Sequence, residues 1–441
     1  MKQRYIILSL CALCVAVLYG QSVKQVEIGQ QMSLAQALGN DWNTADSLVI
    51  TGHASDQDLE MLRQCIYQGV TSGVDMSGCS VAGDAIPDMA FAAEFQTDEH
   101  GITQPSSQLR YFTLPATLRR IGDYAFAFTG LCGLVLPESI EAIGNKAFWQ
   151  CLDLSGDIVV PEGCQVGDNA MEWALGVTRV QLQPGSVLGR YAMSTMPALR
   201  SAELQAGCET GAYALTQNQS LDEVAMADDV KLGDGTFALC PGLTEVCLPA
   251  ALPRIGYDLF YRTGLATFSW PDIQSVEGGN YAIGDRAFMG CQLTDVAVPE
   301  GVTQIGAGAF AGNQGLERIV LPGSLSALSQ DGVLDNCPSL IAIYSKATIP
   351  AVFRVDDAFA QDLCQRATLY VPAGAKQYYQ AMMSWRNFQN IVEVDAFPYS
   401  GVDGITAPTT DDDVYYDLRG IRVKKPSCGL YIHRGKVVAV P

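Results

Sequence analysis

Apolar and small residues recur along this chain in one fixed order, and most repeats are 22 or 23 residues long. The order is Leu-Pro, an aliphatic residue, Ile-Gly, then Ala-Phe, and residues 114–126, 136–148 and 298–310 follow it closely. The bulky residue that ends each copy is called here the anchor of its repeat. The anchors are Phe91, Phe126, Phe148, Met171, Met193, Leu215, Phe237, Phe260, Phe288, Phe310, Leu334 and Phe359. A period of this length predicts a solenoid with one repeat per turn.

The residues of one repeat indicate its local structure. Val246 and Leu248 are separated by one residue, which predicts a short strand with one buried face. Pro249 ends that strand because proline cannot donate the next ladder hydrogen bond. The Ile-Gly step then predicts a turn, and the Ala-Phe pair returns a small and a large side chain to the interior. Because one such turn cannot bury its own apolar face, the turns must stack.

The repeated order closely resembles the leucine-rich repeats of the BspA-like family of secreted bacterial surface proteins. Residues 48–77 resemble the N-terminal cap of that family, with Val-Asp-Met-Ser in place of Leu-Asp-Leu-Ser, and residues 369–393 resemble its C-terminal cap. The repeats anchored by Met171, Met193 and Leu215 depart from the pattern. The resemblance implies a right-handed leucine-rich-repeat solenoid that is mostly β, with short parallel strands, turns and short helical segments.

The N-terminus has the features of a secretory signal peptide. Lys2 and Arg4 precede an apolar run too short to span a membrane with confidence, and Gly20 provides a small residue for cleavage. The predicted organisation is a signal peptide (1–20), an N-terminal cap (21–90), about twelve repeats (91–361), a C-terminal cap (362–398), a linker (399–413) and a small β tail (414–441).

The tail has three β-like runs, at residues 414–423, 429–432 and 435–438, separated by turn residues. It resembles the C-terminal module of many secreted Bacteroidetes proteins, some of which use this module as a sorting signal for export. The alternative is a small accessory β-hairpin without a sorting role.

Two insertions interrupt the period, around residues 96–107 and 276–281. Insertions in a solenoid emerge as loops on one face, where loops often bind ligands. The alternative is surface length that the fold tolerates at little energetic cost.

Two of the fourteen cysteines, Cys11 and Cys14, lie in the predicted signal peptide. The twelve that would remain in an exported chain suggest disulfides, but the repeat argues against most of them. Cysteines follow the anchor by three residues where other repeats have Thr or Asn, and they belong to non-adjacent repeats: Cys151, Cys240, Cys291 and Cys337. Turns that are two strand spacings apart exceed the reach of a disulfide, so we expect free, buried thiols. The same argument excludes pairing of Cys164 with Cys208, and Cys65 with Cys79 is left as a candidate pair.

One row of residues forms the candidate binding face. Each repeat has one outward residue between its two buried strand positions, and only Glu203 in this row is charged. The row comprises Thr113, Val135, Val159, Gln181, Glu203, Ala225, Cys247, Ser269, Ala297, Val320, Tyr344 and Tyr370. A charge-depleted ribbon with terminal aromatic residues is typical of an interface core, although β-propensity alone also favours Val, Thr and Tyr at such positions.

Charge and composition exclude several functions. A formal charge of −20 argues against nucleic acid, which requires clustered Lys and Arg, and only three histidines are available as metal ligands or general bases. Residues 306–312 contain several glycines, but the repeat explains each of them without a nucleotide. We therefore expect no enzyme activity, no cofactor, no metal and no membrane span.

The sequence thus predicts an exported, extracellular or cell-surface recognition protein that binds through the strand face of its solenoid. The family resemblance implies adhesion to a protein of the host matrix or of another bacterial surface. The alternative is a glycan-binding accessory or structural envelope protein, which aromatic platforms at Trp270 or Tyr281, beside the second insertion, would favour. The sequence does not identify the ligand or the oligomeric state.

Overall fold

The computed structural model describes residues 22–93, 96–97, 103–104, 108–271, 273 and 280–398, and residues 415–417, 422–423, 429–433 and 436–440 of the tail. The predicted signal peptide and the linker lie outside the described residues. The chain divides into two compact units, a first unit of Met1–Asp272 with Ile283–Gln292 and a second of Ile273–Ala282 with Leu293–Pro441. The domain boundaries drawn from the sequence stay a prediction.

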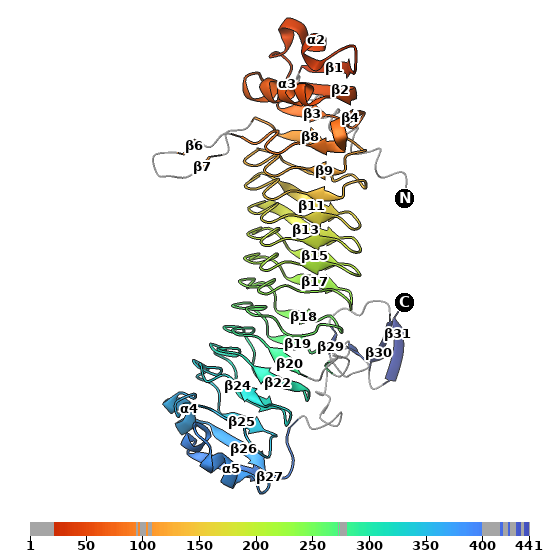
Figure 1. Cartoon of the computed structure of the whole chain (residues 1–441). Helices are drawn as coiled ribbons and strands as arrows, with labels where there is room; N and C mark the ends of the chain where they lie inside the picture. Colours follow the sequence, from red (N-terminus) through yellow and green to blue (C-terminus); the bar gives the residue numbers. More distant parts are fainter. Residues whose placement is uncertain are drawn as a thin grey trace. The chain divides into compact units, whose positions relative to one another are not determined.

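The first unit begins with a parallel sheet in the order β1-β2-β3-β8, with β4 paired to β2 (Figure 1). Its strands are β1 (Val23–Ile28), β2 (Ser47–Ala54), β3 (Gly73–Asp75), β4 (Cys79–Val81) and β8 (Tyr111–Thr113). Its helical segments are α2 (Leu34–Leu38), η1 (Gly39–Asp41), α3 (Asp56–Tyr67) and η2 (Ala82–Asp84). Ser55 and Asp58 form a capping box at the start of α3, and Asp58 also accepts a hydrogen bond from the Leu34 amide at 2.7 Å.

Each well-formed repeat of the first unit contributes two strands, one more than the sequence predicted, to two parallel sheets that we call the front and back sheets (Figure 1). The front sheet comprises β11 (Ser155–Val160), β13 (Gly176–Leu182), β15 (Ser201–Leu204) and β17 (Glu223–Met226), followed by the pair β18 (Glu245–Cys247) and β19 (Thr267–Ser269). The back sheet comprises β5 (Ala85–Ile86), β9 (Arg120–Ile121), β10 (Ala142–Ile143), β12 (Gln165–Val166), β14 (Val187–Leu188) and β16 (Glu209–Thr210).

The anchors form the core, as predicted. All twelve are buried, and none is more than 4% exposed. In the first unit Phe126 stacks on Phe148 with ring centroids 5.2 Å apart, and Phe237, Phe260 and Phe288 stack at 5.9 and 5.6 Å. Met171, Met193 and Leu215 occupy the same column between these groups and are fully buried. The repeats with Met or Leu in place of Phe therefore have a different side chain in the core, but their anchor lies at the same buried position.

A column of glycines allows successive turns to approach closely. A Cβ on Gly144 would lie 2.6 Å from both the Asp123 amide nitrogen and the Gly122 carbonyl carbon of the preceding turn. The same contact recurs at Gly167, where the nearest atom is 2.7 Å away. The glycine of the Ile-Gly step is therefore required by contact with backbone, which cannot move aside as a side chain could.

The third side of each repeat is formed by consecutive turns, which we call the turn side. The residues two before and two after an anchor have positive φ in most repeats, as at Tyr124 (54°) and Phe128 (61°) on either side of Phe126. The amides of both residues donate to carbonyls of the next turn, to Asn145 and Trp149 at 2.9 Å. Backbone hydrogen bonds therefore hold the turn side together, as they do in the two sheets.

The residue three after the anchor satisfies backbone carbonyls from the interior. The thiol of Cys151 donates to the Phe126 carbonyl at 3.1 Å, and Thr129 donates to the same carbonyl at 2.8 Å. Asn218 uses its amide to donate to the Leu215 carbonyl at 2.9 Å. A thiol, a hydroxyl and an amide thus fill one structural role. All eleven described cysteines are free, and these include the candidate pair Cys65 and Cys79.

One buried carboxylate joins three repeats of the first unit. Asp258 is 4% exposed and pairs with Arg286 through two 2.7 Å contacts, while Tyr213 donates to it at 2.8 Å. The Tyr213 ring passes over Gly235, where φ is 64° and a Cβ would lie 2.2 Å from the ring. Burial alone would raise the pKa of Asp258, but the hydrogen bonds from Arg286 and Tyr213 and the charge of Arg286 hold that pKa below its ordinary value.

The second unit contains two parallel sheets, β20-β22-β24 and β21-β23-β25-β26-β27. Their strands are β20 (Tyr281–Ile283), β21 (Asp295–Ala297), β22 (Val302–Ile305), β23 (Arg318–Leu321), β24 (Ala327–Leu328), β25 (Ala342–Ser345), β26 (Thr368–Pro372) and β27 (Asn390–Val394). The helical segments are α4 (Gln361–Arg366), α5 (Lys376–Ala381) and η4 (Trp385–Asn387). Trp385 is buried and packs against Phe353, Phe359 and Tyr379.

The tail is an antiparallel sheet in the order β29-β28-β30-β31, so its three predicted β-like runs contain four strands. They are β28 (Tyr415–Asp417), β29 (Arg422–Val423), β30 (Gly429–His433) and β31 (Lys436–Val440). In the first insertion, β6 (Gln96–Thr97) and β7 (Thr103–Gln104) pair in antiparallel fashion. The sorting role of the tail stays a prediction.

We predict that Gly144→Ala destabilises the protein by about 1–3 kcal/mol, because the new methyl group would overlap the backbone of the preceding turn. Gly133→Ala is the matched control, since no atom lies within 4 Å of a Cβ at Gly133. This control should change stability by less than about 0.5 kcal/mol. Urea unfolding of both variants measures the difference, and equal stabilities would contradict the close-stacking explanation.

We predict that Asp258→Asn makes stability less dependent on pH. The folded-state pKa of Asp258 lies below its unfolded value, so its contribution is present above the unfolded pKa and is lost as pH falls through the folded pKa. Unfolding free energies at pH 7 and pH 3 should therefore differ less in the variant than in the wild type. Asp153→Asn removes a half-exposed pair with Arg110 and should leave the pH dependence nearly unchanged.

We predict that iodoacetamide at pH 8 modifies Cys247 in the folded protein and leaves Cys151, Cys164 and Cys240 intact. Cys247 is exposed, whereas burial raises the pKa of each of the other three thiols to about 12 and closes access to it. Peptide mass spectrometry before and after unfolding in urea measures the pattern. Modification of Cys151 in the folded state, or its recovery as a disulfide, would contradict the burial of this thiol.

Candidate functional site

The front sheet brings part of the predicted binding row into register. Val159, Gln181, Glu203 and Ala225 are direct partners on β11, β13, β15 and β17. Val159 is 45% exposed, Ala225 is exposed, and Gln181 and Glu203 are half-buried. These four side chains form a contiguous outward strip, which we call the strand-face row. Its role in binding stays a prediction.

Three other residues of the first unit extend this row. Thr113 lies on β8, and Cys247 is exposed on β18. Val135 lies in a segment without assigned strand structure, yet it is 57% exposed while Leu134 beside it is buried. Hydrogen bonds of Cys132 to Arg110 and Ser155 join this segment to its two neighbouring repeats.

Ser269 departs from the predicted row, because it is 5% exposed and therefore not an outward residue. It is the last residue of β19, next to Trp270, a few residues before the second insertion. In β19, Phe268 packs on the anchor Phe288 with ring centroids 4.7 Å apart. The outward row of the first unit is thus interrupted at its last strand.

A second outward row runs beside the neutral one, because strand residues two apart share a face. This second row includes Asp157, Arg179 and Glu223 on the front sheet. On β18, the equivalent position is held by Glu245. Arg179 pairs with Glu203 at 3.1 Å, so this pairing neutralises the single charge of the strand-face row. The neutral ribbon is therefore one side chain wide, and the sequence analysis missed its charged neighbour.

The second unit places the remaining predicted residues in register. Ala297, Val320, Tyr344 and Tyr370 are partners on β21, β23, β25 and β26. Tyr344 and Tyr370 stack with centroids 4.4 Å apart, and Phe397 packs edge-on against Tyr344 at 6.4 Å. Val320 is 1% exposed and lies beside the larger Tyr344 side chain, so its prediction as an outward residue is wrong.

The aromatic platforms predicted beside the second insertion are not free. Tyr281 is 1% exposed on β20, so it is a core residue. Trp270 is half-buried and packs edge-on against Phe268 at 4.7 Å. Residues 274–279 of the insertion lie outside the described residues. Tyr281 is therefore closed to a ligand, and Trp270 is partly covered.

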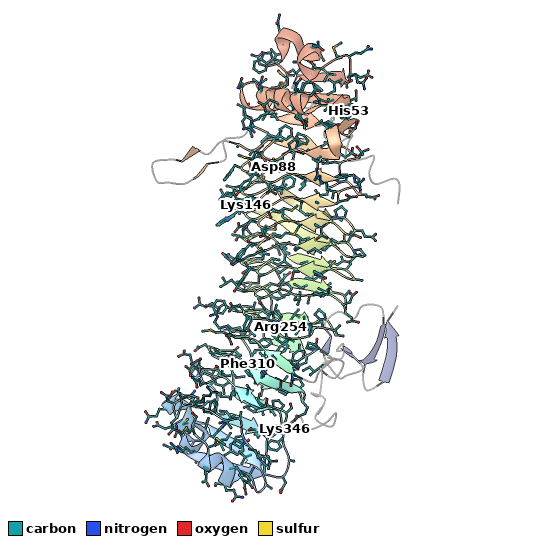
Figure 2. The ribbon with its side chains drawn as sticks, viewed as in Figure 1. His53, Asp88, Lys146, Arg254, Phe310 and Lys346 are labelled. Carbon is teal, nitrogen blue, oxygen red and sulfur yellow. The ribbon has the colours of Figure 1, made fainter. Side chains whose placement is uncertain are left out.

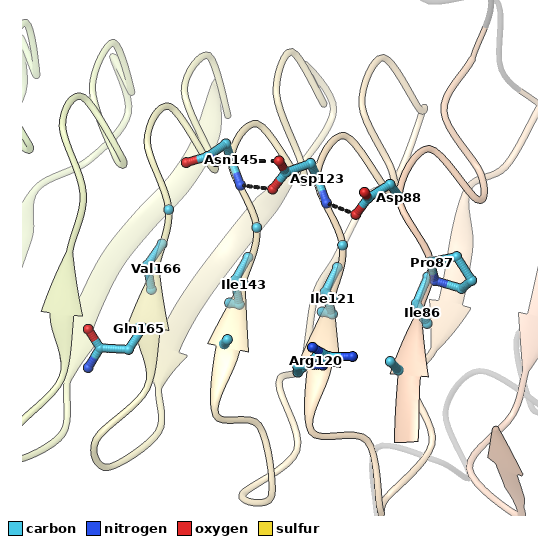
Figure 3. A pocket seen from close by; sticks show the side chains of 15 residues that line it. Ile86, Pro87, Asp88, Arg120, Ile121, Asp123, Ile143, Asn145, Gln165 and Val166 are labelled. Atoms are coloured by element: carbon cyan, nitrogen blue, oxygen red, sulfur yellow. Dashed lines mark hydrogen bonds between the residues drawn. The ribbon is translucent and has the colours of Figure 1, made fainter. Parts of the chain in front are cut away.

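The back sheet carries a pocket of about 520 Å³ (Figure 3). Ala85, Ala142 and Ile143 contribute to it from the strands, and the exposed polar side chains of Arg120 and Gln165 lie on one side of it. The side of the pocket opposite these side chains is formed by Asp88, Asp123 and Asn145, each at the start of a turn.

These three polar residues are used by the backbone. Asp88 Oδ1 accepts a hydrogen bond from the Asp123 amide at 2.8 Å, and Asp123 Oδ1 accepts one from the Asn145 amide at 2.7 Å (Figure 3). In the next turn, Asn145 Oδ1 accepts a hydrogen bond from the Asp168 amide at 2.8 Å. The chain of acceptors continues from Asp168 to the Arg190 amide at 2.7 Å. The carboxylates and amide thus hold successive turns in place, and the pocket shows no arrangement of an acid, a base and a nucleophile.

The turn side carries functional candidates that the sequence analysis missed. Three tyrosines lie two residues before their anchors, namely Tyr124, Tyr191 and Tyr213. Trp149 lies one residue after its anchor, and Trp173 lies two residues after its own. Trp173 is 41% exposed, and Lys146, labelled in Figure 2, lies among these aromatic residues. Aligning the repeats at positions other than the strand would have revealed this aromatic enrichment.

The part of the chain that the structure describes contains neither a group of metal ligands nor a membrane-spanning helix. There, no three His, Cys, Asp or Glu side chains are grouped so that they could hold a metal ion. His53 lies 2.9 Å from the Ser80 hydroxyl in the N-terminal sheet. No described helix has the length and apolar character needed to cross a bilayer.

Several solved structures are similar to this chain. A leucine-rich repeat protein from Bacteroides ovatus is 21% identical over 58% of this chain and 64% of its own length, with a TM-score of 0.43. The pneumococcal vaccine antigen PcpA is 15% identical over 86% of this chain and 90% of its own, with a TM-score of 0.41. A leucine-rich cell surface protein from Faecalibacterium prausnitzii is 16% identical over 73% of this chain and 83% of its own length, with a TM-score of 0.25. The chain thus spans less than two thirds of the Bacteroides ovatus structure.

No curated protein matches the sequence. The family model described as a BspA type leucine rich repeat region matches six copies, at residues 104–171, 165–282 and 281–368, which together exceed half of the chain. The stacked parallel strands and the column of buried anchors have the arrangement that this family implies. The chain therefore belongs to the BspA type leucine-rich repeat family.

Proposed function

We propose that this chain is an exported or cell-surface recognition protein without catalytic activity, and that it binds an extracellular protein through the strand-face row of its first unit. The candidate partners are proteins of a host matrix or of another bacterial surface. Membership in the BspA type leucine-rich repeat family supports a role in binding.

The observation that carries this proposal is the register of the strand-face row. Val159, Gln181, Glu203 and Ala225 are adjacent along four hydrogen-bonded parallel strands, so one surface presents their side chains together. The backbone ladder fixes their positions, which lowers the entropy that binding would cost. A rigid surface of this kind suits a folded partner.

The chemistry of the row resembles the centre of a protein interface. Val135 and Val159 provide exposed apolar area, and Arg179 lies beside the row and pairs with Glu203. Interface centres are depleted in charge and have a polar rim, which the neighbouring row of Asp157 and Glu223 would supply. In a chain with a formal charge of −20, this neutral strip is where an approaching protein meets the least repulsion.

The predicted alternative, a glycan-binding accessory or structural envelope protein, depended on exposed aromatic rings beside the second insertion. Because Tyr281 is buried and Trp270 is packed against Phe268, these two residues give it no support.

We predict that the double substitution Val135→Asp and Val159→Asp weakens binding of the full chain to its protein partner by about tenfold or more, because it replaces the two exposed apolar side chains of this surface with charges. Surface plasmon resonance against immobilised fibronectin, fibrinogen, laminin and collagen measures the change.

The matched control is Gln217→Asp with Gln219→Asp, which adds the same charge at exposed positions of the turn side. This control should bind like the wild type. If the strand-face variant folds, as judged by circular dichroism, and binds as well as the control, the strand face is not the binding surface.

A further inference from the structure

The turn side of the first unit holds large side chains in a backbone conformation that usually requires glycine. Tyr124, Phe128, Trp173, Tyr191 and Tyr213 all have φ between 53° and 70°. In this left-handed region a Cβ approaches the following carbonyl, which disfavours bulky L-residues. The aromatic residues at these positions are therefore retained at a conformational cost.

Other repeats of the same chain show that the backbone does not need these rings. Gly235 occupies the position of Tyr213 one repeat later, and Gly290 occupies the position of Trp173 five repeats later. Asn336 holds that second position with φ of 54°. The turn thus forms with glycine or asparagine, so an aromatic residue there serves something other than the fold of the turn.

Packing explains some of the rings. Tyr191 stacks on Tyr213 with centroids 5.3 Å apart, and Phe128 packs edge-on against Trp149 at 5.0 Å. Among the described residues, however, no ring or cation packs on Trp173, which is 41% exposed. Of the five aromatic residues above, Trp173 is therefore the one whose ring is exposed to a ligand.

Cations lie among these rings. Lys146 Nζ is 4.6 Å from the Trp149 ring and 5.4 Å from the Tyr124 ring, and the Arg190 guanidinium is 5.0 Å from the Tyr191 ring. In the part of the chain that the structure describes, neither cation has a carboxylate within ion-pairing distance, although acidic residues outnumber basic ones by 47 to 27. Both cations remain available as hydrogen-bond donors.

Hydrogen-bonding groups lie beside the same rings. Glu172 Oε2 accepts from the Trp149 indole at 3.0 Å and from the Asn169 amide at 2.8 Å, so all three side chains have fixed positions. The half-buried Gln150 side chain is in the adjacent turn. Amides, a carboxylate and cations set around aromatic rings are the groups that bind sugar hydroxyls while the rings contact the apolar faces of sugars.

We propose that the turn side of the first unit, from Tyr124 to Tyr213, binds a polysaccharide chain, with one sugar stacked on Trp173. This proposal is independent of the strand-face row, which lies on the front sheet. Successive turns are about 4.8 Å apart, close to the length of one pyranose unit, so consecutive repeats can contact consecutive sugars. The row of interleaved rings and polar groups matches an extended polymer better than a single small molecule.

Affinity electrophoresis of the full chain through gels containing laminarin, xylan, polygalacturonate or heparin tests this proposal. At least one polymer should retard the wild type, and Trp173→Gly should weaken that binding by about tenfold or more. Because glycine and asparagine occupy the equivalent position elsewhere, Trp173→Gly and Trp173→Asn should keep the thermal stability of the wild type. Lys146→Gln should weaken binding to polygalacturonate and heparin more than binding to the two neutral polymers, which distinguishes acidic from neutral ligands.

Tyr111→Ala is the matched control, since Tyr111 is a comparably exposed aromatic residue (49%) on β8 of the N-terminal sheet. It should leave retardation unchanged. Absence of retardation by all four polymers, or equal retardation of the wild type and both Trp173 variants, would overturn the proposal. The strand-face variant tests protein binding and should not change retardation by the polysaccharides. The proposal for the turn side and the proposal for the strand face can therefore be contradicted independently.

Discussion

Contact between the backbones of successive turns is the constraint on which the rest of this structure depends. At Gly144 and Gly167 the neighbouring turn leaves no room for a Cβ. This distance brings Phe126 and Phe148 to 5.2 Å and lets Asp123 and Asn145 accept amides of the next turn. Aromatic stacking, the ladders of both sheets and the polar acceptors therefore share one spacing, because a solenoid turn interacts mainly with its neighbours.

The close spacing also determines which surfaces are available for binding. In both sheets the backbone polar groups are paired between strands, so side chains alone can recognise a partner there. The front sheet offers a neutral row beside a charged one, and the turn side offers aromatic residues among cations. These surfaces differ in chemistry although they arise from the same repeat, because each position of the repeat generates its own row.

Much of this fold could be predicted from the sequence because the period fixes register. The buried anchors, the outward partners Val159 and Gln181 and the free thiols follow from repeat position alone. Other features depend on neighbours that the period does not specify. Val320 was expected to face outward but is buried beside Tyr344. Tyr281, considered as a platform for a glycan, is buried on β20. The turn-side aromatic residues could not be predicted from the strand pattern, because they lie outside the strands at positions next to the anchors.

The buried cysteines have a consequence for folding. Cys151, Cys240 and Cys291 donate to carbonyls of the preceding repeat at 3.1 to 3.3 Å, a role that Thr and Asn fill elsewhere. The described cysteines therefore add hydrogen bonds in place of covalent crosslinks. Folding of these repeats requires no oxidant and no disulfide isomerase, and the folded repeats have no crosslink that a reductant could break.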